Sequence, residues 1–216
     1  MKPYYEHGGI TIYHGDCREI LPQLDPVDLV LTDPPYGINY KGDNPSKSKG
    51  LGVIHDGLVG DDKLMDLRFI LNMDCDVVSF GANNYPEQLP HRGRWICWDK
   101  RVNENADRML GSPFELAWRN INHGFYVMIR IMHGGVVNAD GYGRRFHPTQ
   151  KPIALMSRIL NLYPDDNTIL DPFLGSGPTL IAAKNLGRRG IGIEIEEKYC
   201  EIAAKRLAQE VLPLGM

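Results

Sequence analysis

One stretch of the chain joins an apolar run, a glycine turn and a helical pattern. The run Thr168 to Leu170 is typical of a buried strand, and it leads into the turn Asp171 to Gly177 (DPFLGSG). Pro178 then suits the first position of a helix, and Gly187 suits its exit. Open α/β sheets bind ligands at such strand ends, where glycine lets the backbone approach the ligand. The stretch therefore predicts an α/β fold, although a plain tight turn is the alternative for the glycines alone.

Length and composition indicate one ordinary globular domain, spanning residues 1–216. The chain has 216 residues, of which 43% are hydrophobic and 24% charged, and its mean hydropathy is -0.30. No apolar run reaches membrane-spanning length and the amino terminus lacks a signal-peptide pattern, so we expect a cytoplasmic protein without a membrane partner. The four cysteines are scattered without metal-ligand spacing, which predicts free thiols and no metal site.

Positive charge is concentrated in the middle of the chain. Between residues 88 and 151 there are ten Lys and Arg against five Asp and Glu, whereas the whole chain has a net charge of -3. The remainder therefore carries -8, and the middle is the candidate for contact with an anionic polymer. A solvated basic surface explains the same charge equally well. Arg92, Arg94, Lys100, Arg101, Arg144 and Arg145 are the candidate contacts to phosphate or guanine.

A second strand end carries a carboxylate and an aromatic ring. The apolar run 28–32 leads directly into Asp33-Pro34-Pro35-Tyr36. The two prolines stiffen the backbone and remove two amide donors. A surface turn would also use Asp-Pro, but it has no need of a tyrosine. A planar base with an exocyclic amine needs hydrogen-bond acceptors and a ring to stack upon, and these residues provide both.

These two turns resemble the motifs of the DNA amino-methyltransferases. Asp33 to Tyr36 looks like their catalytic motif, and Asp171 to Gly177 is similar to their cofactor motif, which here follows 138 residues later. This order is the circularly permuted arrangement of the β group. The resemblance implies S-adenosylmethionine as cofactor, double-stranded DNA as substrate and the Rossmann-like class I methyltransferase fold. Asp at the first place of the catalytic motif resembles the adenine-N6 enzymes rather than the cytosine-N4 enzymes.

The resemblance also implies roles for individual residues. Glu194 is placed to bind ribose hydroxyls, because it ends the next strand 23 residues after Asp171. Asp16 follows the run 10–14 and looks like the acid near the cofactor adenine, although it also suits the N-cap of a helix at 17–21. Lys151 could pair with the cofactor carboxylate, while a proline-rich helix start explains its neighbours. The expected catalytic residues are Asp33, Pro34, Pro35 and Tyr36, and the expected cofactor-binding residues are Asp16, Thr149, Lys151, Asp171, Phe173, Gly175, Ser176, Gly177 and Glu194.

The patterns together predict a doubly wound, mostly parallel sheet with an antiparallel edge. Expected strands lie at 10–14, 28–33, 77–82, 94–98, 114–119, 168–171 and 190–195, and expected helices at 64–73, 153–163, 179–186 and 197–211. Residues 40–52 are polar and glycine-rich and predict a loop suited to contact phosphate. Residues 84–146 are the expected target-recognition region, inserted between the catalytic and cofactor halves.

The expected reaction is direct transfer of a methyl group from S-adenosylmethionine to N6 of a flipped-out adenine. Cytosine N4 is the nearest alternative, and a noncatalytic DNA-binding module of the same fold is another. A dehydrogenase is disfavoured because Gly177 is not followed by the third glycine of the dinucleotide fingerprint. RNA or a protein amine are further candidate acceptors. The resemblance also implies a homodimer and a cognate restriction endonuclease as partners.

Overall fold

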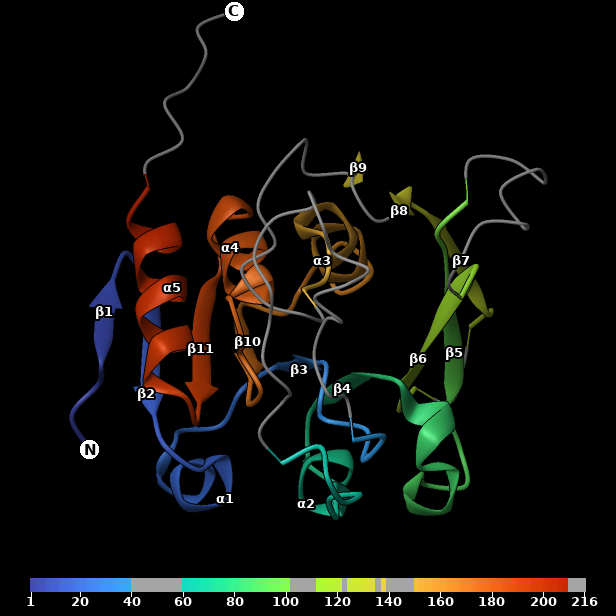
Figure 1. Cartoon of the computed structure of the whole chain (residues 1–216), viewed down its shortest axis with the longest axis horizontal. Helices are drawn as coiled ribbons and strands as arrows, with labels where there is room; N and C mark the ends of the chain where they lie inside the picture. Colours follow the sequence, from blue (N-terminus) through green and yellow to red (C-terminus); the bar gives the residue numbers. More distant parts are fainter. Residues whose placement is uncertain (40–59, 102–111, 122–123, 135–136, 139–149, 210–216) are drawn as a thin grey trace, which may run out of the picture.

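The computed structural model describes residues 1–39, 60–101, 112–121, 124–134, 137–138 and 150–209. Its centre is a sheet in the order β1-β2-β11-β10-β3-β4-β6-β5-β7 (Figure 1). The strands are β1 (Tyr5–His7), β2 (Ile10–His14), β3 (Leu29–Thr32), β4 (Asp76–Phe80), β5 (Arg94–Asp99), β6 (Phe114–Arg119), β7 (Val127–Arg130), β10 (Thr168–Asp171) and β11 (Arg189–Glu194). A separate pair consists of β8 (His133–Gly134) and β9 (Val137–Asn138).

The central strands of the sheet are parallel, and antiparallel pairs occur toward both of its edges. Strands β2, β11, β10, β3 and β4 pair in parallel. Beyond β4, strand β6 runs antiparallel to both β4 and β5, and β1 is antiparallel to β2 at the opposite edge. The predicted mostly parallel sheet with an antiparallel edge is therefore confirmed.

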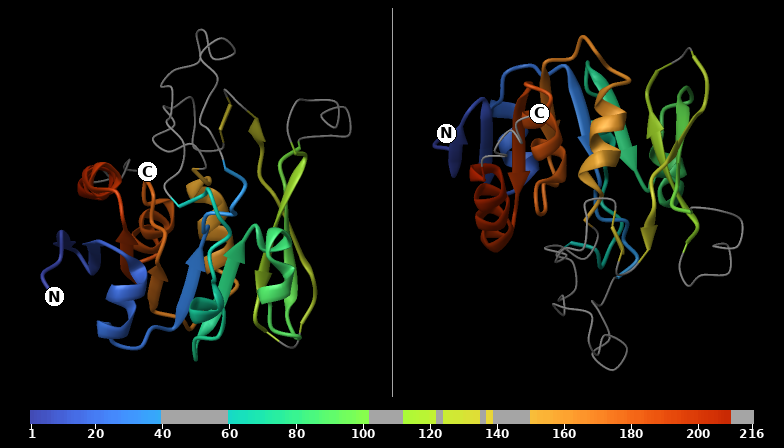
Figure 2. Two further views of the ribbon diagram at one scale, coloured as in Figure 1. Left: turned by 60° about the horizontal axis from the view of Figure 1, so that its bottom comes forward. Right: turned by 90° about the horizontal axis from the view of Figure 1, so that it is seen from above.

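Helices cover both faces of the sheet (Figures 1 and 2). Helices α3 (Ile153–Leu160), α4 (Pro178–Asn185) and α5 (Glu197–Ala208) pack on one face, and α1 (Cys17–Ile20) and α2 (Arg68–Leu71) lie on the other. Alternation along β3 shows why, because Leu29 and Leu31 join the cluster of α3 while Val30 joins that of α1 and α2. Short 3-10 turns at Leu21–Gln23, Ala82–Asn84 and Pro86–Gln88 complete the elements.

Most boundaries of helices and strands agree with those predicted from the sequence, but one helix is much shorter than expected. The prediction of a helix at 64–73 was wrong, because only Arg68–Leu71 is helical. The residues before it are held by other groups: the Leu67 amide donates to Gln88 Oε1 at 2.6 Å. Helix α3 likewise ends at Leu160 rather than at 163, before Pro164. Helix α5 ends at Ala208 rather than at 211, and strands β1, β7, β8 and β9 were not predicted individually.

Several expected features lie outside the described residues. These are the loop at 40–52, Arg144, Arg145 and Thr149. Residues 84–146 are described only in part, so their role in target recognition stays a prediction. Where the chain is described, no helix has the length and apolar character needed to cross a membrane.

Candidate active site and cofactor pocket

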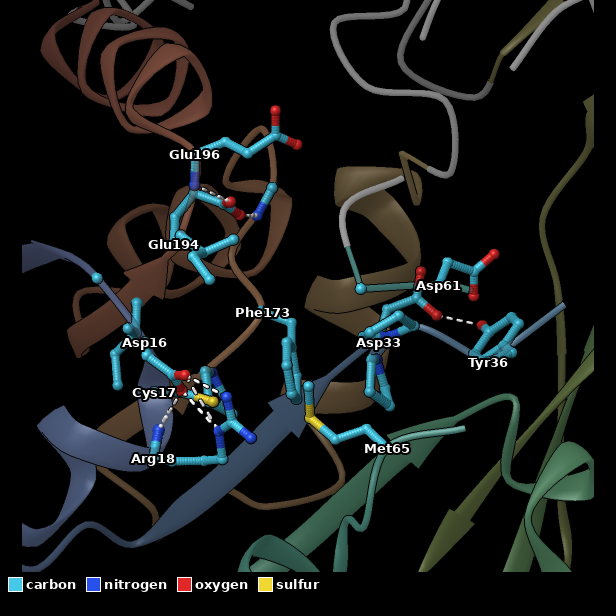
Figure 3. Close-up of a pocket in the computed structure, with 18 of the residues that line it drawn as sticks. Asp16, Cys17, Arg18, Asp33, Tyr36, Asp61, Met65, Phe173, Glu194 and Glu196 are labelled. Atoms are coloured by element: carbon cyan, nitrogen blue, oxygen red, sulfur yellow. Dashed lines mark hydrogen bonds and ion pairs between the residues drawn. The ribbon is translucent and has the colours of Figure 1, made fainter. Parts of the chain in front are cut away.

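The catalytic and cofactor turns meet because their strands are neighbours in the sheet. Strands β3 and β10 pair in parallel, so both turns leave the same edge. Thr32 Oγ1, at the end of β3, donates to Asp171 Oδ1 at 2.8 Å, at the end of β10. A pocket lies over this edge and is lined from both turns, including Asp33 to Tyr36, Pro172, Phe173 and Gly175 (Figure 3). The expected juxtaposition of the two turns is thus confirmed.

The carboxylate of Asp33 is surrounded by polar partners at one end of this pocket. Tyr36 Oη donates to Asp33 Oδ1, and Lys151 Nζ lies 2.5 Å from Asp33 Oδ2. Burial raises the pKa of Asp33 above its ordinary value, against the opposing effect of Lys151. Burial and the adjacent Asp33 raise the pKa of Tyr36 well above its usual range, so the phenol remains a hydrogen-bond donor.

Gly81 makes room for the ring of Tyr36. Its φ is +65°, and a Cβ atom at this position would lie 2.0 Å from Tyr36 Cε1. The glycine follows β4, the parallel neighbour of β3, so the strand order brings it under the catalytic turn. Both the backbone conformation and the close approach therefore exclude a larger residue here.

Replacing Gly81 with alanine is expected to displace Tyr36 and to lower the free energy of unfolding by about 2–4 kcal/mol. Gly8→Ala is the matched control, because Gly8 has φ of +58° and a Cβ added there would meet no heavy atom within 4 Å. Urea denaturation of both variants measures the difference. An equal loss in the two variants would show that conformational strain alone acts at Gly81.

The cofactor turn is fixed to the end of β11 by a buried carboxylate. Glu194 is 8% exposed, and its oxygens accept the Gly175 amide and the Glu196 amide, each at 2.8 Å. Burial raises the pKa of Glu194 in spite of these two donors. Each carboxylate oxygen has two lone pairs, so Glu194 retains acceptor capacity toward the pocket that it lines. Gly177, with φ of +81°, is the N-cap residue of α4.

Asp16 caps a helix and also lines the pocket. Its Oδ1 accepts the Arg18 amide at 2.9 Å at the start of α1. The guanidinium of Arg18 forms an ion pair with the same carboxylate, and its hydrogen bonds lower the pKa of Asp16. The structure thus gives Asp16 the predicted cap and places it on the pocket wall.

Three of the predicted cofactor residues, Asp171, Ser176 and Gly177, belong to the glycine turn but are not among the described residues that line the pocket. Asp171 and Ser176 instead make contacts that hold the turn in place. Asp171 is 3% exposed and its Oδ1 also accepts the Phe173 amide at 3.2 Å. Ser176 Oγ donates to Gln150 Oε1 at 3.0 Å. Burial raises the pKa of Asp171 to about 6.

The raised pKa of Asp171 predicts how Asp171→Asn changes stability with pH. The ordinary pKa of Asp is about 4, so between pH 4 and 6 the folded chain holds a proton that the unfolded chain has lost. The stabilisation from this proton decreases as the pH rises. Asparagine preserves the acceptor oxygen and does not titrate. The unfolding free energy of the variant relative to wild type should therefore increase by about 2 kcal/mol from pH 4 to 7, and a constant difference in urea denaturation would contradict the shift.

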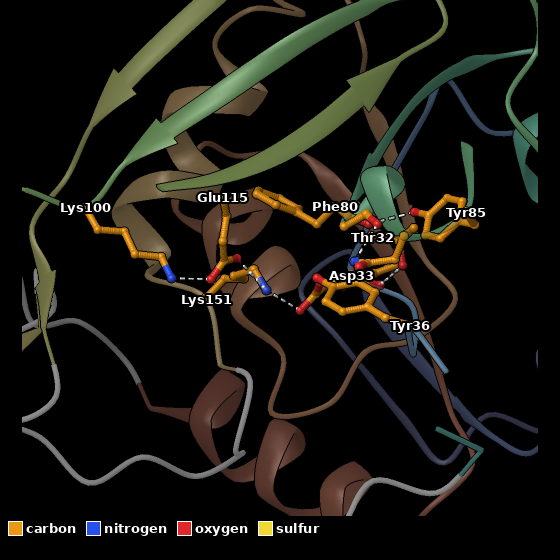
Figure 4. A network of polar contacts seen from close by, with 11 residues as sticks. Thr32, Asp33, Tyr36, Phe80, Tyr85, Lys100, Glu115 and Lys151 are labelled. Atoms are coloured by element: carbon orange, nitrogen blue, oxygen red, sulfur yellow. Dashed lines mark hydrogen bonds and ion pairs between the residues drawn. The ribbon is translucent and has the colours of Figure 1, made fainter. Parts of the chain in front are cut away.

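A chain of alternating charges extends from Asp33 away from the pocket (Figure 4). Lys151 Nζ, besides its contact with Asp33, lies 3.3 Å from Glu115 Oε2, and Lys100 pairs with the other oxygen of Glu115. The ammonium of Lys151 also lies 5.2 Å from the centroid of the Phe80 ring. Lys151 was expected to pair with the cofactor carboxylate, but the structure places it against Asp33 and Glu115 instead.

Two residues of the site carried no recognisable sequence pattern. Asp61 is 1% exposed and its Oδ1 accepts the Gly37 amide at 2.8 Å, directly after the catalytic turn. Met65 and Asp61 both line the pocket. They line the pocket because residues 60–67 pack beside the catalytic turn. No spacing of residue types in the sequence predicts this long-range contact. Among the described residues there is no cluster of His, Cys, Asp and Glu that could hold a metal ion.

The doubly wound sheet, with a glycine turn and an Asp-Pro-Pro-Tyr turn at adjoining strand ends, defines a class I methyltransferase fold. The family described as DNA methylase, of N6 and N4 methyltransferases, matches residues 95–205. The chain belongs to this family.

Known relatives support this assignment along the full length of the chain. The type II methyltransferase M.ScaI of Streptomyces caespitosus is 26% identical over 274 residues, covering 99% of this chain and 86% of that protein. M2.DpnII of Streptococcus pneumoniae is 27% identical, with 97% and 93% covered.

Two solved structures share the fold. M1.HpyAVI, crystallised with S-adenosylmethionine, has a TM-score of 0.57 at 28% identity and covers 93% of this chain and 100% of its own. The cytosine-N4-specific PvuII DNA methyltransferase has a TM-score of 0.61 at 16% identity, with 98% and 90% covered.

Proposed function

We propose that this DNA methylase transfers the methyl group of S-adenosylmethionine to N6 of an adenine in double-stranded DNA. The observation that carries the proposal is the position of Asp33 and Tyr36 at one end of a pocket whose other end holds Gly175 and Glu194. A methyl donor in this pocket and a base beside Tyr36 would meet at Asp33.

The residues of the pocket fit the chemistry of the proposed cofactor. Glu194 and Asp16 are acceptors for hydroxyl or amine groups, and Phe173 and Ile195 supply apolar surface for a purine ring. Gly175 presents backbone without a side chain at the turn. When bound, S-adenosylmethionine supplies an electrophilic methyl group on its sulfonium. The M1.HpyAVI complex, a relative with this cofactor, supports the assignment.

The protein contributes positioning to the reaction. In the proposed complex the target base has left the helix and stacks on Tyr36. The Asp33 carboxylate and the Pro34 carbonyl accept hydrogen bonds from the exocyclic amine, which orients its lone pair toward the methyl group. In the transfer the N–C bond would form as the S–C bond breaks, S-adenosylhomocysteine would leave with the sulfur electron pair, and the surplus proton of the amine would pass to the Asp33 carboxylate or to water. Among the described residues of the pocket, Cys17 is the single thiol, and the proposal requires no covalent intermediate.

We assign adenine rather than cytosine because Asp33 occupies the first place of the catalytic motif. The fold does not separate these bases, since the cytosine-N4-specific PvuII enzyme shares it. We further propose a homodimer and, by analogy with the type II names of its relatives, a cognate restriction endonuclease.

Incubation with methyl-labelled S-adenosylmethionine tests both the acceptor and the base. Unmethylated double-stranded DNA of mixed sequence is the substrate, with RNA of the same sequence as the comparison. N6-methyladenine among the product nucleosides supports the proposal. N4-methylcytosine would overturn the choice of base, and label confined to RNA or protein would overturn DNA as the acceptor.

A further inference from the structure

We propose that Lys151 is a positioning residue that holds the Asp33 carboxylate in its catalytic orientation, with Glu115 as its second anchor, and that it does not bind the cofactor. This inference rests on the proposed function, because it assigns Asp33 the contact with the target amine. Glu115 and Lys151 come from β6 and from the residues just before α3, so two separate segments converge on the catalytic turn (Figure 4).

The ammonium of Lys151 already has close partners within the protein, and Lys151 is not among the described residues that line the cofactor pocket. The residue is 5% exposed, and its Nζ lies 2.5 Å from Asp33 Oδ2 and 3.3 Å from Glu115 Oε2. The ring of Phe80 takes another side of the ammonium, with 5.2 Å between Nζ and the ring centroid. A cofactor carboxylate would have to displace one of these buried partners, which is costly for an ion pair in this environment.

The same contacts fix the orientation of Asp33. Lys151 holds Oδ2 while Tyr36 donates to Oδ1, so the plane of the carboxylate is defined from both sides. Each oxygen keeps a lone pair for a further donor. Glu115 in turn holds Lys151 in place and is itself paired with Lys100. The charges of these four groups sum to zero, which favours their close approach at a site where Lys151 is buried and the other three are partly buried.

The balance of charge around Asp33 depends on Lys151. Among the described residues, the ionisable groups that act on Asp33 are Lys151, Glu115 and Tyr36 from the cluster, and Tyr85 and Asp171 also sense its charge. Burial raises the pKa of Glu115, but Lys151 and Lys100 together bring it below its ordinary value. Without Lys151 two partly buried carboxylates would have only Lys100 as a positive partner in this cluster. The pKa of Asp33 would then rise further.

The residue beside Lys151 links the catalytic turn to the cofactor turn. Gln150 Oε1 accepts from Ser176 Oγ at 3.0 Å, while Lys151 contacts Asp33. The side chains of two adjacent residues therefore contact the two turns, one each. This explains how a residue near the cofactor motif in sequence serves the catalytic carboxylate in space.

Lys151→Met tests the proposal, because methionine preserves much of the side-chain volume and removes the charge. We expect single-turnover methyl transfer at pH 7 to fall by about 10- to 100-fold, with the Kd for S-adenosylmethionine unchanged in calorimetric titration. The acid limb of the pH–rate profile should move to higher pH, since Asp33 must be ionised to accept the amine. Lys151→Arg should recover part of the rate. Lys205→Met is the control, since Lys205 is 72% exposed in a surface ion pair, and its rate should equal that of wild type.

A second substitution separates electrostatic support from simple packing. Adding Glu115→Gln to Lys151→Met removes the surplus negative charge beside Asp33. The double variant should transfer methyl groups about tenfold faster than Lys151→Met alone. A double variant that is slower than the single variant would contradict the proposed charge balance.

Failure of this inference is distinct from failure of the proposed function. A wild-type protein that transfers methyl groups, with a Lys151→Met variant that only loses cofactor affinity, would overturn the positioning role and support a cofactor contact. If wild type transfers no methyl group, the proposed function fails, and carbon-13 NMR titration of the Asp33 carboxyl still decides the inference. A higher pKa of Asp33 in Lys151→Met than in wild type supports it, and equal values refute it.

Discussion

Asp33→Asn is expected to reduce the rate of methyl transfer by about 10²–10³-fold and to leave the Kd for S-adenosylmethionine essentially unchanged. Asparagine matches the shape of aspartate, but its amide nitrogen is a donor where the reaction needs an acceptor. It also removes the negative partner of Lys151, whose ammonium is 2.5 Å from the carboxylate. Single-turnover kinetics at saturating cofactor, with calorimetric binding, measure the two effects separately.

Tyr36→Phe is the matched control for Asp33→Asn. It keeps the ring for stacking and removes the hydroxyl that donates to Asp33, so we expect a smaller fall in rate. A folded Asp33→Asn protein with wild-type transfer would contradict the assigned role. Loss of cofactor binding in the folded variant would instead place Asp33 in the cofactor site.

Glu194→Ala is expected to raise the Kd for S-adenosylmethionine by about 10- to 100-fold, the loss of a hydrogen bond to a charged group. It should also lower the unfolding free energy by about 2–5 kcal/mol, because the amides of Gly175 and Glu196 would lose their buried acceptor. Calorimetric titration and urea denaturation measure the two quantities. The transfer rate at saturating cofactor should change much less than the affinity.

Glu201→Ala, in the helix that follows β11, provides the control. Glu201 lies in α5 and its side chain is 58% exposed in a surface ion pair with Lys205. Its removal should alter neither cofactor affinity nor stability by more than about 1 kcal/mol. If Glu194→Ala lost stability without any loss of cofactor affinity, Glu194 would be a structural support of the glycine turn only.

The sequence predicts the parallel part of the fold because its signals are local. Each central strand is a short apolar run with a marked end, and the turn at 171–177 carries its own glycines and proline. The pairing of β3 with β10, which joins the two turns, follows from the motif order of the permuted family. The helix at 64–73 failed as a prediction because tertiary contacts such as that of Gln88 with the Leu67 amide decide this segment.

The site was only partly predictable, because proximity to a motif does not define which way a side chain points. Lys151 lies near the cofactor motif in sequence but contacts Asp33. Asp171 lies within that motif, yet it supports the turn through Thr32 and the Phe173 amide. Asp61 and Glu115 could be identified as residues of the site only from the structure, because segments far apart in the sequence bring them there. The sequence did predict pocket-lining residues that lie at the end of a strand, such as Asp33 and Glu194.

A crystal structure with the nonreactive cofactor analogue sinefungin and a short DNA duplex would test the central claim most directly. We predict the analogue in the pocket between Phe173 and Glu194, with the target base extrahelical, stacked on Tyr36 and hydrogen-bonded through its amine to Asp33. Lys151 should remain on the Asp33 carboxylate. An analogue bound elsewhere, or a target amine that does not contact Asp33, would contradict the account.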